Sequence, residues 1–304
     1  MKLIPVKPGA TIQWVTPASP LSADKLDFAT NLLHSHGYKT KVAPHALEWD
    51  GYLAGSDRDR AGDLQAAFDD DETAAVFTTR GGYGCARLFP YLDLDRIVRS
   101  RKMLLGFSDV TALHVALNRR GMPTVHSPMA LTLHYPREDW VYESLIRVLR
   151  GDLVPPSEAP APTTVVGGVA IGKTVGGCMC LLTDSIGTPE ELDTDGKILV
   201  IEDVDEQPHR IDAMFTHLVN SGLAAKSAGF VIGQMTRTDE HVDEAIGGRP
   251  WRDIITERLA PLGKPMIFDF PFGHMKGMLT IALGLMARLD ADAGTLTFLE
   301  PLCE

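Results

Sequence analysis

A serine at the junction of a predicted strand and a predicted helix is the feature of the sequence best suited to nucleophilic chemistry. Residues 103–106 (MLLG) predict a short buried strand, and apolar side chains recur at helical spacing after Asp109. A sharp turn there would expose the Ser108 hydroxyl, and the free N–H groups of the helix could face a developing negative charge. Ser108 is therefore a candidate nucleophile, although a serine at this place can also simply cap the helix. The motif is not G-x-S-x-G, because Val110 stands where the second glycine would be.

A serine nucleophile needs a base and a third group that orients the base. Among the ten histidines of the chain, His274 is the best placed, because it lies in a turn directly after an apolar, strand-like run. The orienting carboxylate should also end a strand, as Glu202 does. The spacing of the residues alone does not choose among Glu202, Asp203 and Glu206.

A glycine-rich loop, Gly81-Gly82-Tyr83-Gly84, follows another predicted strand. Glycines let backbone N–H groups approach a substrate closely, so the N–H groups of Gly82 and Asp109 could together hold an oxyanion. Phosphate binding is the competing interpretation. However, G-x-x-x-x-G-K-[ST] is absent, and Leu88 stands where a dinucleotide fingerprint would have its third glycine. A tight turn without chemistry is the remaining alternative.

Composition excludes several classes of protein. The 304 residues carry 29 Lys and Arg against 40 Asp and Glu, a formal net charge of −11, so a nucleic acid is not an expected partner. No apolar run is long enough for a membrane helix, and the N-terminus lacks the apolar core of a signal peptide. We therefore expect a cytoplasmic protein with no membrane partner.

The four cysteines suggest neither disulfides nor a metal site. Cys178 and Cys180 are separated by one residue, which is neither C-x-x-C nor a disulfide framework, and no paired metal-ligand spacing occurs. Free, buried thiols are the expectation.

The first half of the chain alternates strand-like and helix-like segments. The predicted strands are 11–15, 39–42, 74–78 and 103–106, and the predicted helices are 22–36, 57–70, the segment after Ser108, and 138–150. Such repeats bury a mainly parallel sheet between helices, and ligands bind outside the carboxyl ends of its strands. Both Ser108 and the glycine loop follow such ends.

The second half is richer in strands and mixed. Its predicted strands are 167–172, 197–202, 229–233 and 265–270, with helices at 210–219 and 252–259 and a hairpin-like end over 280–299. The proline-rich residues 155–162 favour a linker between the halves. We predict a first domain over 1–150, a linker over 151–165 and a second domain over 166–304.

Together these motifs resemble the LD-carboxypeptidase family of serine peptidases. The matching segments keep the order of the family and extend from about residue 10 to the end; they are Arg80-Gly81-Gly82-Tyr83-Gly84 with Arg87-Leu88, Gly106 to Ala112, Ile186-Gly187-Thr188-Pro189, Ile201-Glu202-Asp203 with Glu206, Pro208 and Arg210, and Phe272-Gly273-His274 with Leu283-Gly284.

The resemblance implies a triad with Ser108 as nucleophile, His274 as general base and acid, and Glu202 as orienting carboxylate, with the latter two supplied by the second domain. It also implies an α/β fold with a Rossmann-like, parallel N-terminal domain and a β-rich, mixed C-terminal domain. The implied active site lies between the domains and requires no metal or cofactor. Homodimers are implied as well. Gly82 and Asp109 remain the predicted oxyanion hole.

The same resemblance implies a small peptide substrate. The expected reaction releases a C-terminal D-Ala from murein tetrapeptide during cell-wall recycling, and Arg80, Tyr83 and Arg210 are candidate substrate contacts. An alternative is the cleavage of an aspartyl–nucleotide amide, as in microcin C immunity peptidases. A binding protein that keeps the fold without catalysis is an alternative of another class. Cys178, where the family often has Asn, and Ala282, where proline is frequent, depart from the family pattern, and the first of these could alter the wall of the pocket.

Overall fold

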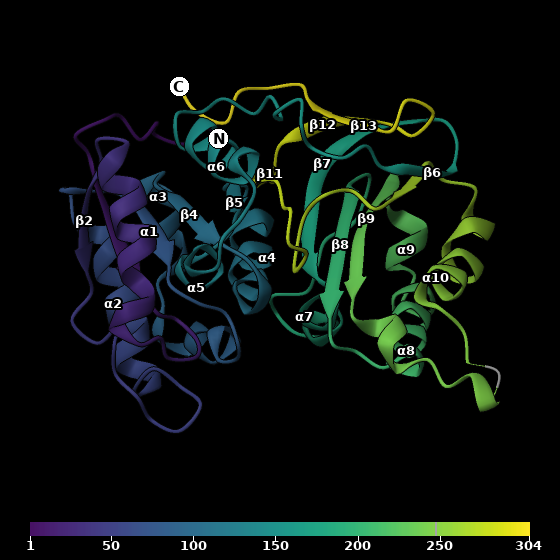
Figure 1. Cartoon of the computed structure of the whole chain (residues 1–304), viewed down its shortest axis with the longest axis horizontal. Coiled ribbons are helices and arrows are strands. Elements are labelled where there is room, and N and C mark those ends of the chain that lie inside the picture. Colours follow the sequence, from purple (N-terminus) through teal and green to yellow (C-terminus); the bar gives the residue numbers. More distant parts are fainter. Residues whose placement is uncertain (247) are drawn as a thin grey trace. The chain divides into compact units, whose positions relative to one another are not determined.

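The computed structural model describes residues 1–246 and 248–304, and these form two compact units. Unit 1 comprises Met1–Ser157, Leu279–Leu283 and Pro301–Glu304, and unit 2 comprises Glu158–Met278 and Gly284–Glu300. Both units are built on a sheet with helices (Figure 1). Nowhere in these described segments is there a helix both long and apolar enough to cross a membrane.

Unit 1 contains a six-stranded sheet in the order β11-β5-β4-β3-β1-β2. Its strands are β1 (Thr11–Val15), β2 (Lys39–Val42), β3 (Thr73–Thr78), β4 (Met103–Gly106), β5 (Thr124–His126) and β11 (Ile281–Leu283). Strands β1 to β5 are parallel to their neighbours, and β11 runs antiparallel to β5 at the edge. The central strand β4 is buried along its whole length, as expected where helices cover both faces of a parallel sheet. This sheet confirms the predicted parallel α/β architecture.

The helices of unit 1 alternate with its strands. They are α1 (Ala23–Ser35), α2 (Asp57–Asp69), α3 (Leu94–Ser100), α4 (Thr111–Arg119), α5 (Ala130–His134) and α6 (Asp139–Leu149), together with the 3₁₀ turns η1 (Cys85–Tyr91) and η2 (Ser108–Val110). Two of them begin at side-chain caps: Ser56 accepts the Asp59 N–H before α2, and Asp93 accepts the Arg96 N–H before α3. Helix α1 packs against α5, and α2 packs against α3.

Unit 2 contains a seven-stranded mixed sheet in the order β13-β12-β7-β8-β9-β10-β6. Its strands are β6 (Thr163–Val166), β7 (Val169–Cys178), β8 (Ile198–Val204), β9 (Gly229–Thr236), β10 (Met266–Phe268), β12 (Met286–Asp290) and β13 (Thr295–Phe298). Strands β7 to β10 run parallel, whereas β6, β12 and β13 pair antiparallel. The predicted strand-rich, mixed second half is thereby confirmed.

Four helices accompany this sheet among the described residues. They are α7 (Met179–Ser185), α8 (Pro208–Asn220), α9 (Leu223–Lys226) and α10 (Trp251–Leu259), with the 3₁₀ turns η3 (Thr238–His241), η4 (Glu244–Ile246) and η5 (Ala260–Leu262). Helix α8 packs against α9 and α10 on one side of the sheet (Figure 1). Pro208 occupies the first turn of α8, where its missing N–H costs no hydrogen bond.

The C-terminal segment departs from the predicted hairpin in one respect. Strands β12 and β13 do form an antiparallel hairpin that turns before Thr295. Ile281–Leu283 does not belong to it, because this segment pairs with β5 in the sheet of unit 1. The sequence of a three-residue apolar run does not indicate which strand it pairs with. The prediction that Ile281–Leu283 belongs to the hairpin was wrong.

Candidate active site

Ser108 occupies a strained turn between β4 and η2 of unit 1. Its φ angle of +62° lies in the left-handed region, which non-glycine residues seldom adopt and which often marks functional sites. The turn also depends on Gly106, because a Cβ atom there would lie 2.2 Å from the Thr78 hydroxyl oxygen. The predicted strand-to-helix junction thus exists, and the serine is half-buried at its apex.

The glycine loop after β3 lies directly against this serine. A Cβ atom on Gly81 would stand 3.0 Å from Ser108 Oγ and 3.3 Å from the backbone nitrogen of Asp109. Ser19 holds the loop from the other side, since its N–H donates to the Gly81 carbonyl at 3.1 Å and its hydroxyl accepts the Tyr83 N–H at 3.2 Å. The structure therefore brings the predicted nucleophile, the glycine loop and the Asp109 amide together within unit 1.

The side chain of Asp109 ties the same two segments together. Its buried carboxylate accepts the Cys85 N–H at 2.7 Å, and burial raises the pKa of this carboxyl above its ordinary value despite that bond. Arg60, also buried, donates to the carbonyl of Gly84 at 3.2 Å and to that of Pro17. The Asp109 carboxylate thus fixes the end of the glycine loop to the Ser108 turn, and Arg60 fixes it to the segment after β1.

A buried histidine hydrogen-bonds to the end of β4, directly before the turn. His114 of α4 contacts the Gly106 carbonyl at 2.9 Å through Nε2. Burial lowers the pKa of His114 to about 4, so the ring is neutral at pH 7. We infer that Nε2 carries the proton and donates it to this carbonyl.

In unit 2, Glu202 and His274 form a close pair. Glu202 lies in β8 with a fully buried side chain, and its Oε2 receives hydrogen bonds from His274 Nδ1 at 2.7 Å and from the His274 backbone N–H at 3.0 Å. A proton on Nδ1 makes Nε2 the basic nitrogen of the ring. This is the arrangement in which a carboxylate orients a catalytic histidine.

Gly273 makes this contact possible. Its φ angle is +91°, and a Cβ atom there would stand 2.4 Å from both Cγ and Oε2 of Glu202. Burial by itself would lower the pKa of His274, but the charge and hydrogen bond of Glu202 outweigh it, helped by the charges of Asp203 and Asp205. The pKa of His274 is therefore raised above its ordinary value.

The other two acidic candidates have different partners. Asp203 accepts the backbone N–H groups of Cys180 at 2.8 Å and Val204 at 2.7 Å, and burial together with the charge of Glu202 raises its pKa to about 6. Glu206 lies 3.9 Å from the Nε atom of Arg210 on α8. Of the three carboxylates that sequence left open, the structure brings Glu202 to His274.

The residues predicted to contact substrate already contact other residues of the protein to different degrees. Arg80 donates to the Pro20 carbonyl at 3.0 Å, so one end of its guanidinium holds the segment before α1. Tyr83 is exposed and packs edge-on against Tyr52. Arg210 is 56% exposed beside Glu206, so its guanidinium remains accessible to solvent.

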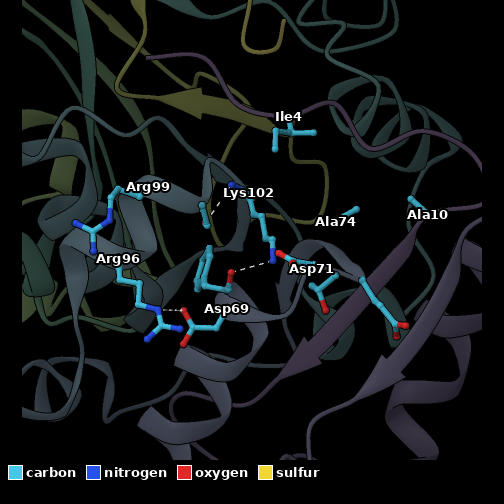
Figure 2. Close-up of a pocket in the computed structure, with 12 residues that line it drawn as sticks. Ile4, Ala10, Asp69, Asp71, Ala74, Arg96, Arg99 and Lys102 are labelled. Carbon is cyan, nitrogen blue, oxygen red and sulfur yellow. Dashed lines mark hydrogen bonds and ion pairs between the residues drawn. The ribbon is translucent and has the colours of Figure 1, made fainter.

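A separate cavity of about 650 Å³ lies near the amino ends of β3 and β4, at the other end of these strands from the Ser108 turn. Figure 2 shows residues that line it. Three of its charged side chains are engaged with other groups of the protein. Lys102 donates to the carbonyls of Phe68 and Asp70, and Arg96 pairs with Asp69 at 2.7 Å. Because ligands of parallel sheets bind at the carboxyl ends of strands, this cavity does not compete with the Ser108 turn.

The sequence did not predict three groups that hold the glycine loop: Ser19, Arg60 and the carboxylate of Asp109. Ser19 had a detectable signal, since it lies between two prolines directly after the first strand. Arg60 had none, because a charged residue inside an amphipathic helix normally faces solvent.

Comparison with known proteins shows that both halves of the chain match domains of the same family. Residues 12–127 match the LD-carboxypeptidase N-terminal domain, and residues 171–289 match the LD-carboxypeptidase C-terminal domain. A protein of Streptomyces coelicolor that bears the name of a carboxypeptidase is 37% identical over 303 residues, 97% of this chain and 96% of its own length. The murein tetrapeptide carboxypeptidase of Pseudomonas aeruginosa is 32% identical over 275 residues, 86% of each chain.

A solved structure confirms the fold. The microcin C7 self immunity protein MccF, in complex with aspartyl sulfamoyl adenosine, matches with a TM-score of 0.89 over the whole of both chains at 22% identity. At that identity, the likeness establishes the architecture and nothing about the ligand.

Proposed function

Since the chain belongs to the LD-carboxypeptidase family of serine peptidases, we propose that it releases the C-terminal D-Ala of murein tetrapeptide during cell-wall recycling. The observation that carries the proposal is the buried 2.7 Å contact between Glu202 and His274 Nδ1, which leaves Nε2 as the base. The strained turn at Ser108 supports it from unit 1. Ser108, Glu202 and His274 are then the triad.

The proposed reaction begins with proton transfer. His274 takes the Ser108 proton as Oγ bonds to the carbonyl carbon of the scissile amide, and Glu202 stabilises the imidazolium that forms. His274 then gives this proton to the nitrogen of D-Ala as the C–N bond breaks. Water resolves the acyl-enzyme by the same route and returns the proton to Ser108.

The oxyanion of each tetrahedral intermediate needs hydrogen-bond donors beside Ser108. We assign this role to the N–H groups of Gly82 and Asp109. The position of Gly81 against Ser108 and the Asp109 nitrogen supports the assignment, because it sets the glycine loop next to the reacting oxygen.

A carboxypeptidase also has to recognise a free carboxylate. Arg80, Tyr83 and Arg210 remain the predicted contacts, and an Arg fork suits a carboxylate well. Arg210 is the better supported of the two arginines, since it is exposed and its ion pair with Glu206 is long, whereas Arg80 already holds a backbone carbonyl. Catalysis in the cytoplasm and a homodimer are further predictions.

A second candidate substrate follows from the structural likeness to MccF, whose complex contains aspartyl sulfamoyl adenosine. Cleavage of an aspartyl–nucleotide amide would need an aromatic platform for the base. Three of the four tryptophans, Trp14, Trp140 and Trp251, are buried, and Trp49 is 63% exposed. Trp49 is thus the one tryptophan accessible for stacking. The murein peptide remains the first candidate because the murein tetrapeptide carboxypeptidase is 32% identical to this chain, whereas MccF is 22% identical.

The test compares wild type with Ser108→Ala on murein tetrapeptide and on processed microcin, with released D-Ala and cleaved nucleotide measured separately. We expect D-Ala release by wild type and its loss in Ser108→Ala, with the melting temperature preserved. Ser35→Ala is the matched control, since Ser35 ends α1 and donates to the Leu32 carbonyl on the surface.

Full turnover by Ser108→Ala would contradict the assignment of the nucleophile. Faster cleavage of processed microcin than of tetrapeptide would favour the second substrate. Tight binding of tetrapeptide without turnover by wild type would identify a binding protein instead.

A further inference from the structure

Two cysteines and an aspartate converge beside Glu202 in unit 2. The sulfur atoms of Cys178 and Cys180 lie 3.4 Å apart, and Cys178 Sγ lies 3.4 Å from Oδ1 of Asp203. One potential ligand atom from each of the three residues lies within 4.8 Å of the others. The reaction proposed above uses none of these three side chains.

The local fold fixes this cluster. Cys178 is the last residue of β7 and stands in parallel register with Glu202 of β8, so Asp203 follows directly beside it. Helix α7 begins at Met179, and the Cys180 N–H at its first turn donates to Asp203 Oδ2 at 2.8 Å. Two sulfurs from the end of a strand and the start of a helix are thereby directed to one carboxylate.

We propose that Cys178, Cys180 and Asp203 form a binding site for a thiophilic divalent cation of the Zn²⁺ class. Zn–S bonds of about 2.3 Å and a Zn–O bond of about 2.0 Å in a tetrahedron separate two sulfurs by about 3.8 Å, and a sulfur from an oxygen by about 3.5 Å. The observed 3.4 Å separations are within about 0.4 Å of both values. Two thiolates with a carboxylate are a ligand set that selects Zn²⁺ or Cd²⁺ over Mg²⁺ and Ca²⁺.

Access and charge agree with this site. Cys178 and Asp203 are buried, whereas Cys180 is partly exposed, so a cation can enter past Cys180. On binding, both S–H bonds break, two protons pass to the buffer and two metal–sulfur bonds form, with no change of oxidation state. The three ligands leave a fourth position for water.

The site would be inhibitory, and this part of the inference rests on the proposed function. Asp203 holds the N–H groups of Cys180 and Val204, and a cation that recruits its carboxylate competes with those bonds. Movement of residue 203 displaces its neighbour Glu202, whose 2.7 Å contact orients His274. Occupancy by Zn²⁺ therefore lowers turnover without occupying the substrate site.

The experiment titrates the full chain, kept reduced, with Cd²⁺ and follows the sulfur-to-metal charge-transfer absorption. We expect one Cd²⁺ per chain. Cys178→Ser and Cys180→Ser should each weaken binding by at least about tenfold. Even mutation of a residue that only hydrogen-bonds to a metal ligand lowers metal affinity by about 10–100-fold. Cys303→Ser is the control, a partly exposed cysteine of unit 1 that should leave binding intact.

The site is refuted if wild type shows no charge-transfer band, or if the band survives in both Cys178→Ser and Cys180→Ser. Should Cys178→Ser fail to fold, the partly exposed Cys180 carries the test alone. In a parallel assay, Zn²⁺ should inhibit D-Ala release by wild type but not by Cys180→Ser. Binding without inhibition overturns the coupling to Glu202, whereas Cd²⁺ binding by a protein that never releases D-Ala overturns the proposed function and leaves the site standing.

Discussion

Replacing Gly273 by alanine should disable His274 while leaving every catalytic side chain in the sequence. The added Cβ would lie 2.4 Å from Cγ and Oε2 of Glu202, whereas non-bonded carbon contacts settle at about 3.5–4.0 Å. The carboxylate must therefore retreat by about 1 Å. That movement stretches the 2.7 Å contact with His274 Nδ1 to about 3.7 Å, beyond hydrogen-bonding distance.

The size of the effect follows from what this contact does. A misplacement of about 1 Å commonly costs about 10²-fold in rate, and loss of the orienting carboxylate in a serine triad costs about 10⁴-fold. We expect kcat for D-Ala release to fall within that range with little change in KM. The left-handed backbone adds a loss of about 1–2 kcal/mol in the free energy of unfolding.

Gly222→Ala separates the two effects. Gly222 has a similar φ of +80°, lies in the same unit, and has no atom within 4 Å of its added Cβ among the described residues. It should lose the same backbone stability and keep full activity. The pH–rate profile gives a second readout: Glu202 raises the pKa of His274, so its displacement should move the acid limb to lower pH in Gly273→Ala alone. An unchanged kcat and profile in Gly273→Ala would refute the role of the Glu202–His274 contact.

Two further predictions concern unit 1. Gly82→Ala places a Cβ 2.3 Å from the Ser19 hydroxyl oxygen, so the loop should shift and kcat should fall by about 10²–10³. The control is Gly51→Ala, which is also at positive φ but has no close contacts and should keep the wild-type kcat. Equal kcat values for the two variants in steady-state assays would contradict the oxyanion assignment. Because the pKa of His114 falls from 6.5 to about 4 on folding, the native state binds fewer protons in that range and should gain about 3 kcal/mol as pH rises from 4 to 7. His114→Gln, which can still donate to the Gly106 carbonyl, should flatten that dependence in urea unfolding, and an unaltered slope would show that His114 titrates normally.

Much of the fold was predictable because its central strands are fully buried. In β4 and β8 nearly every residue is buried, so an unbroken apolar run marks each strand in sequence. The residues at the carboxyl ends of these strands could be found in the same way. Ser108 and Glu202 were recognised as candidates because each follows such a run directly.

The interactions that position those residues were not predictable. Gly273 contacts Glu202 across more than 70 positions of the chain, and nothing in the triplet Phe272-Gly273-His274 announces that its glycine must accommodate a distant carboxylate. Arg60 likewise looks like an ordinary surface residue of a helix until its burial is known. The segment Ile281–Leu283 fails for the same reason, since strand pairing between distant segments leaves no local signal.

The burial of Glu202 connects the structure of the pair to its chemistry. The Oε1 atom of Glu202 is buried and has no hydrogen-bond partner in the part of the chain that is described, so its charge is poorly compensated by neutral donors. A proton on His274 gives the carboxylate a positive charge to interact with. The free energy of that interaction is what raises the pKa of the imidazole. In the proposed reaction, His274 becomes an imidazolium as each tetrahedral intermediate forms. The buried, incompletely bonded carboxylate therefore stabilises that state more than the resting pair, in which the imidazole is neutral and the carboxylate charge is uncompensated. A carboxylate exposed to water in its place would lose this difference to solvent screening.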